Sequence, residues 1–126
     1  MNFFKTKTTR DIGFDKEKKA IKHIKNLKYK ILATNFTTNF GEIDIIAKDK
    51  DILVFIEVRY RKSLYSGTPQ ESVRFTKQQK IIKSAIVYMK INNIKSDIRF
   101  DIIAICNDEI ELIKSAFVPM QNQYYI

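Results

Sequence analysis

Hydrophobic and polar residues alternate along residues 41–61, GEIDIIAKDKDILVFIEVRYR, which predicts two β-strands joined by a polar turn at residues 48–51. Successive side chains of a strand point to opposite faces. One face is apolar throughout, with Ile43, Ile45, Ala47, Ile52, Val54, Ile56 and Val58. The other face is apolar near the turn, at Ile46, Leu53 and Phe55, and charged away from it. This charged end is the candidate site.

The charged end of the hairpin brings like charges together. If the strands pair around residues 50–51, Asp44 lies opposite Glu57 and Glu42 lies opposite Arg59, with Cβ atoms about 5 Å apart. Two carboxylates at that distance repel each other, partial burial adds a desolvation cost, and a cation would relieve both. In the alternative, purely structural reading, Glu42 and Arg59 form an ordinary ion pair and the two opposed carboxylates share a proton. A register shifted by one residue would separate those carboxylates.

Helical periodicity predicts a helix over residues 10–27. Its apolar stripe consists of Phe14, Ala20, Ile21, Ile24 and Leu27. Glu17 lies within this stripe, so it is either a satisfied core carboxylate or part of a site that faces inward. Residues 29–36 predict the first strand.

The second half of the chain predicts a helix and one or two further strands. A capping box at residues 68–71 and a second cap at Thr76 predict a short helix and then a longer one to about residue 92. Residues 97–106 and 109–117 read as strands. The order α-β-β-β-α-β, with one more possible strand, predicts an α/β fold with a mixed sheet flanked by helices. The long helix permits a parallel crossover.

The length of 126 residues predicts one domain, 1–126, in which residues 1–9 form a flexible N-terminus and residues 118–126 a tail. The net charge of +9 favours a polyanionic partner, above all nucleic acid. One histidine and one cysteine argue against Ser–His, Cys–His and cysteine-based zinc chemistry. We interpret Cys106 as a small core residue.

Two further absences narrow the predicted setting. The sequence has no apolar run of the roughly 20 residues that a membrane helix needs, and its first residues lack the pattern of a signal peptide. We therefore predict a cytoplasmic protein without a membrane partner. Because a glycine-rich phosphate loop is also missing, we expect no nucleotide cofactor.

The unusual charged residues together suggest a metal site. Carboxylates without histidine or cysteine are oxygen ligands that suit Mg²⁺ or Mn²⁺. Glu17, Asp44 and Glu57, with Glu42 nearby, are the candidate carboxylates, and Arg59 would stabilise charge on a phosphate. This donor set fits phosphodiester hydrolysis.

Basic residues near these carboxylates are candidates for nucleic-acid binding. Arg61 and Lys62 follow the charged strand, and Lys77, Lys80 and Lys83 are spaced three apart on the predicted helix. The three lysines either follow a phosphate backbone or form a solvated helix face.

Several motifs also carry a family resemblance. The spacing G-E-I-D-(x12)-E-V-R resembles the PD-(D/E)XK nuclease motif. More closely, Gly13-x-x-x-Glu17, ILATN, GEIDIIA, LVFIEVRYR, SV and RFDIIAI resemble the YraN-type family of predicted endonucleases, which is related to Holliday junction resolvases. The resemblance implies a restriction endonuclease-like core, DNA as partner and a possible homodimer.

The same resemblance implies roles for individual residues. Asp44, Glu57 and the main-chain carbonyl of Val58 would bind Mg²⁺ or Mn²⁺, and Glu17 would complete the site. Arg59 stands where this superfamily usually has lysine; arginine can stabilise charge, but it does not titrate as lysine sometimes does.

Three functions are therefore in competition. The first is a metal-dependent endonuclease that hydrolyses DNA, with branched or single-stranded DNA as candidate substrates. The second is a nucleic-acid-binding module on a nuclease-like scaffold with weak or no catalysis. The third is an adaptor whose basic surface binds an acidic protein.

Overall fold

The computed structural model describes residues 9–61 and 67–119, with only the helical backbone given for residues 9–14 and 16. Two helices and five strands follow one another in the order α-β-β-β-α-β-β, which confirms the predicted order and includes the fifth strand. Their bounds are α1 Thr9–Asn26, β1 Lys30–Thr37, β2 Glu42–Asp49, β3 Ile52–Arg61, α2 Phe75–Ile91, β4 Ile98–Cys106 and β5 Glu109–Phe117. A short 3₁₀ helix, η1 Gln70–Ser72, precedes α2.

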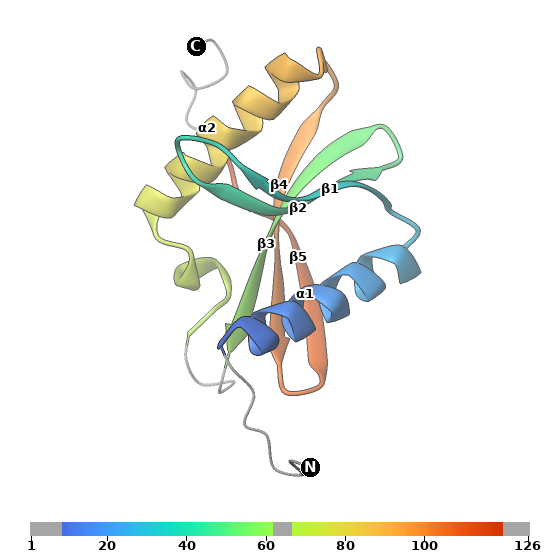
Figure 1. Cartoon of the computed structure of the whole chain (residues 1–126), viewed down its shortest axis with the longest axis vertical. Coiled ribbons are helices and arrows are strands. Elements are labelled where there is room, and N and C mark those ends of the chain that lie inside the picture. Colours follow the sequence, from blue (N-terminus) through green and yellow to red (C-terminus); the bar gives the residue numbers. More distant parts are fainter. Residues whose placement is uncertain (1–8, 62–66, 120–126) are drawn as a thin grey trace.

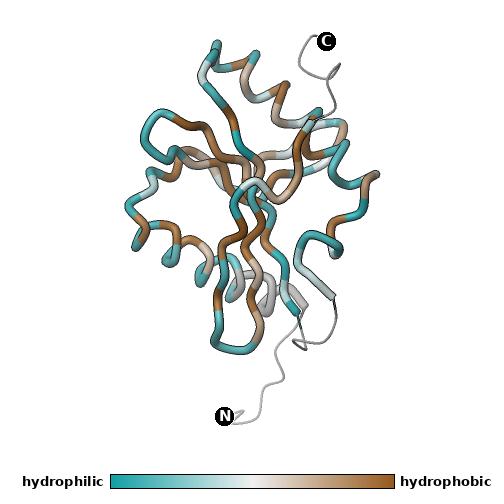
Figure 2. Tube along the Cα trace, turned by 180° about the vertical axis from the view of Figure 1, so that it is seen from behind, coloured by the Kyte–Doolittle hydropathy of each residue, from teal (hydrophilic) through white to brown (hydrophobic). Residues whose placement is uncertain are grey.

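The five strands form one sheet in the order β1-β2-β3-β4-β5, in which only β3 and β4 run parallel (Figure 1). The connection through α2 supplies the crossover that this parallel pair needs. Buried residues of α1, Ala20 and Ile24, pack on one face of the sheet. Buried residues of α2, such as Ile81 and Ile82, pack on the other. Both helices therefore cover hydrophobic strands, seen as brown segments at the centre of Figure 2.

The register of the central hairpin agrees with the prediction. Pairing runs from Ile45 opposite Ile56 to Asp49 opposite Ile52, and the turn consists of Lys50 and Asp51. Lys50 has a φ of 55°, the left-handed conformation that such tight turns use. The same register, continued by one residue, puts Asp44 beside Glu57.

One detail of the predicted hairpin is wrong. Strict alternation assigned Ile43 to the same face as Ile45, but Ile43 packs with Ile46 in the cluster beneath α2, whereas Ile45 packs beneath α1. The paired register with β3 ends at Ile45, and the next contact is made by a side chain: Asp44 Oδ2 accepts a hydrogen bond from the Val58 amide at 2.8 Å. The regular alternation of β2 side chains between the two sheet faces ends at Asp44, whose carboxylate accepts from the Val58 amide where a main-chain carbonyl would otherwise do so.

The predictions for the helix ends were partly correct. At residues 68–71 the Thr68 hydroxyl accepts from the Glu71 amide at 3.2 Å, and the Glu71 carboxylate accepts from the Thr68 amide at 3.4 Å. This confirms the capping box. The predicted cap at Thr76 is wrong because α2 begins earlier, at Phe75. Leu27, predicted to be in the core, is 43% exposed because α1 ends before it.

A partly buried ionic network, with the fully buried Asp101 at its centre, connects β2, β4 and β5 to the segment before β1. Arg99 donates to both oxygens of Asp101 at 2.9–3.1 Å, to Asp49 Oδ2 at 3.0 Å and to the Tyr29 hydroxyl at 3.0 Å. Asp101 is fully buried and also accepts from the Ser115 amide at 2.9 Å. Each charge therefore has a direct partner.

Cys106 is buried at the end of β4, as predicted. Neither α1 nor α2 is long and apolar enough to cross a lipid bilayer.

Candidate functional site

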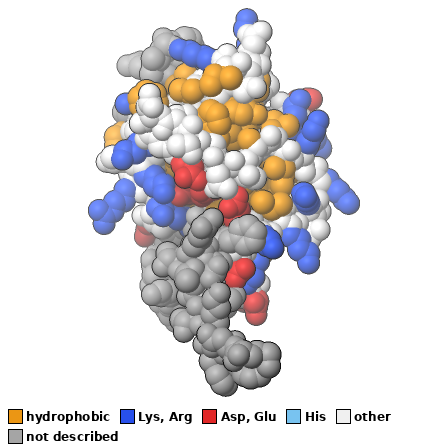
Figure 3. Space-filling model, in the orientation of Figure 1, with side chains coloured by type: hydrophobic (Ala, Val, Ile, Leu, Met, Phe, Trp, Pro, Cys, Tyr) orange, Lys and Arg blue, Asp and Glu red, His pale blue; other side chains and the backbone are white. Residues whose placement is uncertain are grey.

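A cleft of about 290 Å³ lies where the start of β2, the middle of β3 and the first half of α2 meet. Its lining consists of Gly41, Glu42, Asp44, Glu57, Lys77, Lys80 and Ile81. On the face drawn in Figure 3, acidic side chains are grouped near the centre and positive side chains lie beside them. Acidic and basic side chains therefore line the same cleft.

Glu57 forms the buried acidic wall of this cleft and is only 4% exposed. Lys77 Nζ lies 2.9 Å from its Oε1, and Arg59 Nε lies 3.9 Å from the same oxygen. Burial and the neighbouring charge of Asp44 raise the pKa of Glu57 to about 7, although Lys77 and Arg59 oppose this shift. Glu57 thus sits at a position where a further cation or a proton would be favourable.

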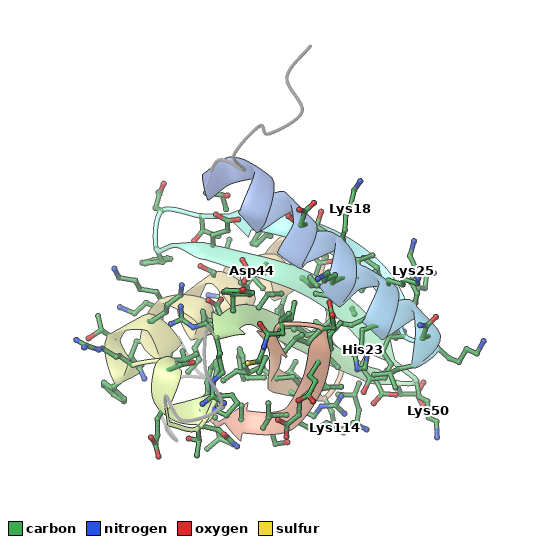
Figure 4. All side chains as sticks on the ribbon, turned by 90° about the horizontal axis from the view of Figure 1, so that it is seen from below. Lys18, His23, Lys25, Asp44, Lys50 and Lys114 are labelled. Atoms are coloured by element: carbon green, nitrogen blue, oxygen red, sulfur yellow. The ribbon has the colours of Figure 1, made fainter. Side chains whose placement is uncertain are left out.

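Asp44 is held in place by the backbone of the adjacent strand. Its Oδ2 accepts from the amide of Val58, the residue that follows Glu57. Figure 4 shows Asp44 on β2, between α1 and α2. The predicted juxtaposition of Asp44 and Glu57 is therefore present, and a hydrogen bond fixes the orientation of the first carboxylate.

Glu17 reaches the same level of the sheet from α1 but contacts a different residue. Its Oε1 accepts from Asn35 Nδ2 at 2.7 Å. Asn35 lies between residues of β1 that pair with Ile45 and Ile43, so it is level with Asp44. Within residues 9–61 and 67–119, no three acidic, histidine or cysteine residues are grouped closely enough to hold a metal ion. The structure thus brings together Asp44 and Glu57 and places Glu17 against Asn35.

The alternative ion pair between Glu42 and Arg59 is not formed. Glu42 is exposed and pairs with Thr37 on the β1 side of β2. The Arg59 guanidinium instead donates through Nη2 to the Ser72 carbonyl at 2.7 Å. This hydrogen bond holds the Arg59 guanidinium against η1, with its Nε 3.9 Å from Glu57 Oε1.

The three α2 lysines do not form one uniform solvated face. Lys77 and Lys80 line the cleft, whereas Lys83 Nζ lies 5.5 Å from the centroid of the Phe40 ring. Arg61 is half-buried at the end of β3, and its Nη2 is buried without a hydrogen-bond partner. Lys62 lies outside the described residues.

The contact between Lys77 and Glu57 was not predicted from the sequence, where Lys77 was expected either to contact a phosphate backbone or to belong to a solvated helix face. The crossover from β3 to β4 returns α2 over the sheet face that carries Glu57. A lysine early in that helix is therefore the cation best placed to reach this carboxylate, and this topological argument could have singled it out.

The pKa of Glu57 makes chain stability depend on pH. Its ordinary value is 4.5, so between pH 4.5 and about 7 the folded chain holds a proton that the unfolded chain has lost. Relative to Glu57→Gln, the free energy of unfolding of the wild type should therefore fall by about 3 kcal/mol as pH rises through this window. Urea unfolding with a chelator present measures this, and a difference independent of pH would contradict the prediction.

Comparison with known proteins assigns a family to the chain. Residues 16–105 match the model of the uncharacterised protein family UPF0102. A UPF0102 protein of Thermodesulfovibrio yellowstonii is 48% identical over 85% of this chain and 96% of its own length. UPF0102 proteins of Persephonella marina and Clostridium botulinum are each 46% identical, over 83% and 86% of this chain and 91% and 94% of theirs. The chain therefore belongs to the protein family UPF0102.

Proposed function

We propose that this protein is a Mg²⁺- or Mn²⁺-dependent endonuclease that hydrolyses phosphodiester bonds of branched or single-stranded DNA. The observation that carries the proposal is the pair Asp44 and Glu57, held side by side in a cleft whose other wall is basic. The net charge of +9 favours a polyanionic substrate at this wall. The resemblance of the GEID and EVR motifs to PD-(D/E)XK nucleases supports the same chemistry.

The residues present fit a divalent cation. Glu57 and Asp44 offer oxygen ligands of the kind that Mg²⁺ and Mn²⁺ prefer, and the raised pKa of Glu57 records the electrostatic cost that a cation would lower. By the family resemblance, the main-chain carbonyl of Val58 would be the third ligand. Mg²⁺ keeps several positions for water and phosphate oxygens, so two carboxylates are enough side chains for such a site. A bound cation would polarise the phosphate and provide a metal-activated water as nucleophile.

The cationic side chains of this chain have separate roles in the proposal. Lys77 is 45% exposed on a flexible stem, so its ammonium can move from Glu57 to the incoming phosphate. Arg59 is held by Ser72 and keeps a fixed positive charge beside Glu57. Lys80 and Lys83, farther along α2, bind the phosphates that flank the one under attack.

The proposal is tested by incubating the protein with linear, flap and four-way DNA in Mg²⁺ or Mn²⁺. We expect cleavage of at least one of these forms with either metal and none with a chelator. If every form stays intact with both metals, the protein does not have this activity on DNA.

A DNA-binding module without catalysis is the second candidate. Two observations favour it: Lys77 already forms an ion pair with Glu57, and Glu17 is hydrogen-bonded to Asn35 and not placed beside the carboxylate pair. This candidate predicts salt-sensitive DNA binding that is unchanged in Asp44→Ala and Glu57→Ala, together with no cleavage by the wild type.

The basic wall of the cleft yields a prediction that holds for both candidates. The double variant Lys80→Gln/Lys83→Gln should bind duplex DNA more weakly and reduce the slope of log K against log salt by about 2, since two phosphate contacts are lost. Fluorescence anisotropy at several salt concentrations measures the slope.

The matched control removes two exposed lysines from α1, on the opposite face of the sheet, in Lys22→Gln/Lys25→Gln. Figure 4 shows Lys25 pointing away from the sheet. Equal slopes for the two double variants would show that binding follows net charge and not this cleft.

A further inference from the structure

An exposed aromatic ring stands at the rim of the cleft. Phe40 lies in the loop between β1 and β2 and is 46% exposed, and its neighbour Gly41 lines the cleft. Phe40 belongs to neither of the two hydrophobic clusters of the core, so the packing of the core does not account for it.

The loop that carries Phe40 is held in one conformation. The Thr38 hydroxyl accepts from the amides of Phe40 at 3.0 Å and Gly41 at 3.3 Å, and the Thr38 amide donates to the Gly41 carbonyl at 2.8 Å. The ring is therefore presented by a closed turn, which lowers the entropy lost when a ligand binds to it.

The turn is also fastened to α2. The Thr38 hydroxyl lies 2.7 Å from the hydroxyl of Ser84, which is fully buried in α2. A Cβ placed on Gly41 would lie only 3.4 Å from Cβ of Lys80, so the loop backbone packs directly against the helix. Phe40 consequently keeps a fixed position relative to the cleft lysines.

Positive charge accompanies the ring. Lys83 Nζ lies over one face of the Phe40 ring, 5.5 Å from its centroid, and Lys80 lies one turn earlier on α2, in the lining of the cleft. An exposed aromatic ring with lysines next to it is a combination that binds single-stranded nucleic acid, because a base stacks on a face of the ring while the cations bind the phosphates.

We propose that Phe40 is a stacking platform for an unpaired DNA base, and that it makes the cleft prefer single-stranded segments over continuous duplex. Bases inside a duplex are already stacked on both sides, so only an unpaired or terminal base offers a face to the ring. The proposal rests on the proposed function, since it specifies which DNA reaches Asp44 and Glu57.

The test measures binding without metal, so that it does not depend on cleavage. A labelled single strand of about 20 nucleotides, long enough for one binding site, and the corresponding duplex are titrated with the protein in chelator. Phe40→Ala should weaken single-strand binding about 5- to 150-fold and duplex binding less than about twofold. Phe40→Tyr should bind as the wild type does, and Phe40→Leu should resemble Phe40→Ala because it lacks an aromatic face.

Ile91→Ala is the matched control, because Ile91 is a 69% exposed apolar residue at the far end of α2. It should leave both affinities unchanged. Equal weakening of both DNA forms in Phe40→Ala, or full binding by Phe40→Leu, would overturn the stacking role.

The two proposals fail in different ways. Preferential single-strand binding that depends on Phe40, without cleavage in any metal, would keep the platform and reject the nuclease. Metal-dependent cleavage by the wild type, together with unaltered single-strand affinity in Phe40→Ala, would keep the nuclease and reject the stacking platform.

Discussion

Replacing Asp44 by asparagine is expected to reduce metal-dependent DNA cleavage by more than about 100-fold, because changes to residues that only support metal ligands already cost 10- to 100-fold. The substitution is conservative in structure. The asparagine carbonyl oxygen can still accept the hydrogen bond from the Val58 amide, so the chain direction at the end of the β2–β3 pairing is retained. Only the negative charge beside Glu57 is lost.

The loss of the Asp44 charge can also be measured independently of cleavage. Asp44 is one of the causes that raise the pKa of Glu57, so Asp44→Asn should lower this pKa and leave thermal stability at neutral pH unchanged or higher. Loss of cleavage with full stability would then reflect chemistry and not unfolding.

Glu109→Gln is the control for Asp44→Asn, since Glu109 is an exposed carboxylate at the start of β5 and does not line the cleft. Cleavage rates are compared on whichever DNA form the wild type cuts. An Asp44→Asn protein that cuts at the wild-type rate would remove Asp44 from the metal site.

The second large effect concerns stability. Asp101→Ala should lower the free energy of unfolding by about 3–5 kcal/mol, the usual cost of breaking a buried ion pair by removing one partner. The change deprives Arg99, which is 12% exposed, of its closest partner and leaves the Ser115 amide without an acceptor. For a domain whose total stability is about 5–15 kcal/mol, this is a large fraction.

Urea unfolding of Asp101→Ala and Asp108→Ala compares the loss of a buried carboxylate with the loss of an exposed one. Asp108 is fully exposed and lies 3.8 Å from Lys19, so its loss should change the free energy of unfolding far less than the loss of Asp101 does. The double variant Arg99→Met/Asp101→Leu should recover the part of the loss that comes from the unpaired Arg99, because it removes both charges together, while the Ser115 amide stays without its acceptor. If the two aspartate variants lowered the free energy of unfolding equally, Asp101 would not contribute more to stability than an exposed aspartate does.

The local sequence predicted the elements and the juxtaposition of Asp44 and Glu57. Alternation along residues 41–61 predicted the hairpin and its register, because a two-residue turn leaves one pairing that buries the apolar face. That register alone places Asp44 next to Glu57. The helix positions, the capping box at residues 68–71 and the two C-terminal strands also follow from short-range patterns.

Long-range packing decided what alternation could not. Ile43 packs on the α2 side, where the Asp44 carboxylate accepts a hydrogen bond from the Val58 amide. No period in the sequence encodes this contact between a side chain and the backbone. The Arg59 guanidinium turned to the Ser72 carbonyl of η1, which lies in a different element. Glu17 met Asn35, and its helical spacing could predict only that it faces inward.

The sequence by itself therefore determined the α/β order, the hairpin register and the adjacency of Asp44 and Glu57, since each depends on neighbours along the chain or across one turn. Only the tertiary structure decided that Lys77 contacts Glu57 and that Phe40 stands beside Lys83. Both contacts require α2 to fold back over β2 and β3. The position of a crossover helix on a sheet is set by packing between distant residues, not by the local pattern of either segment.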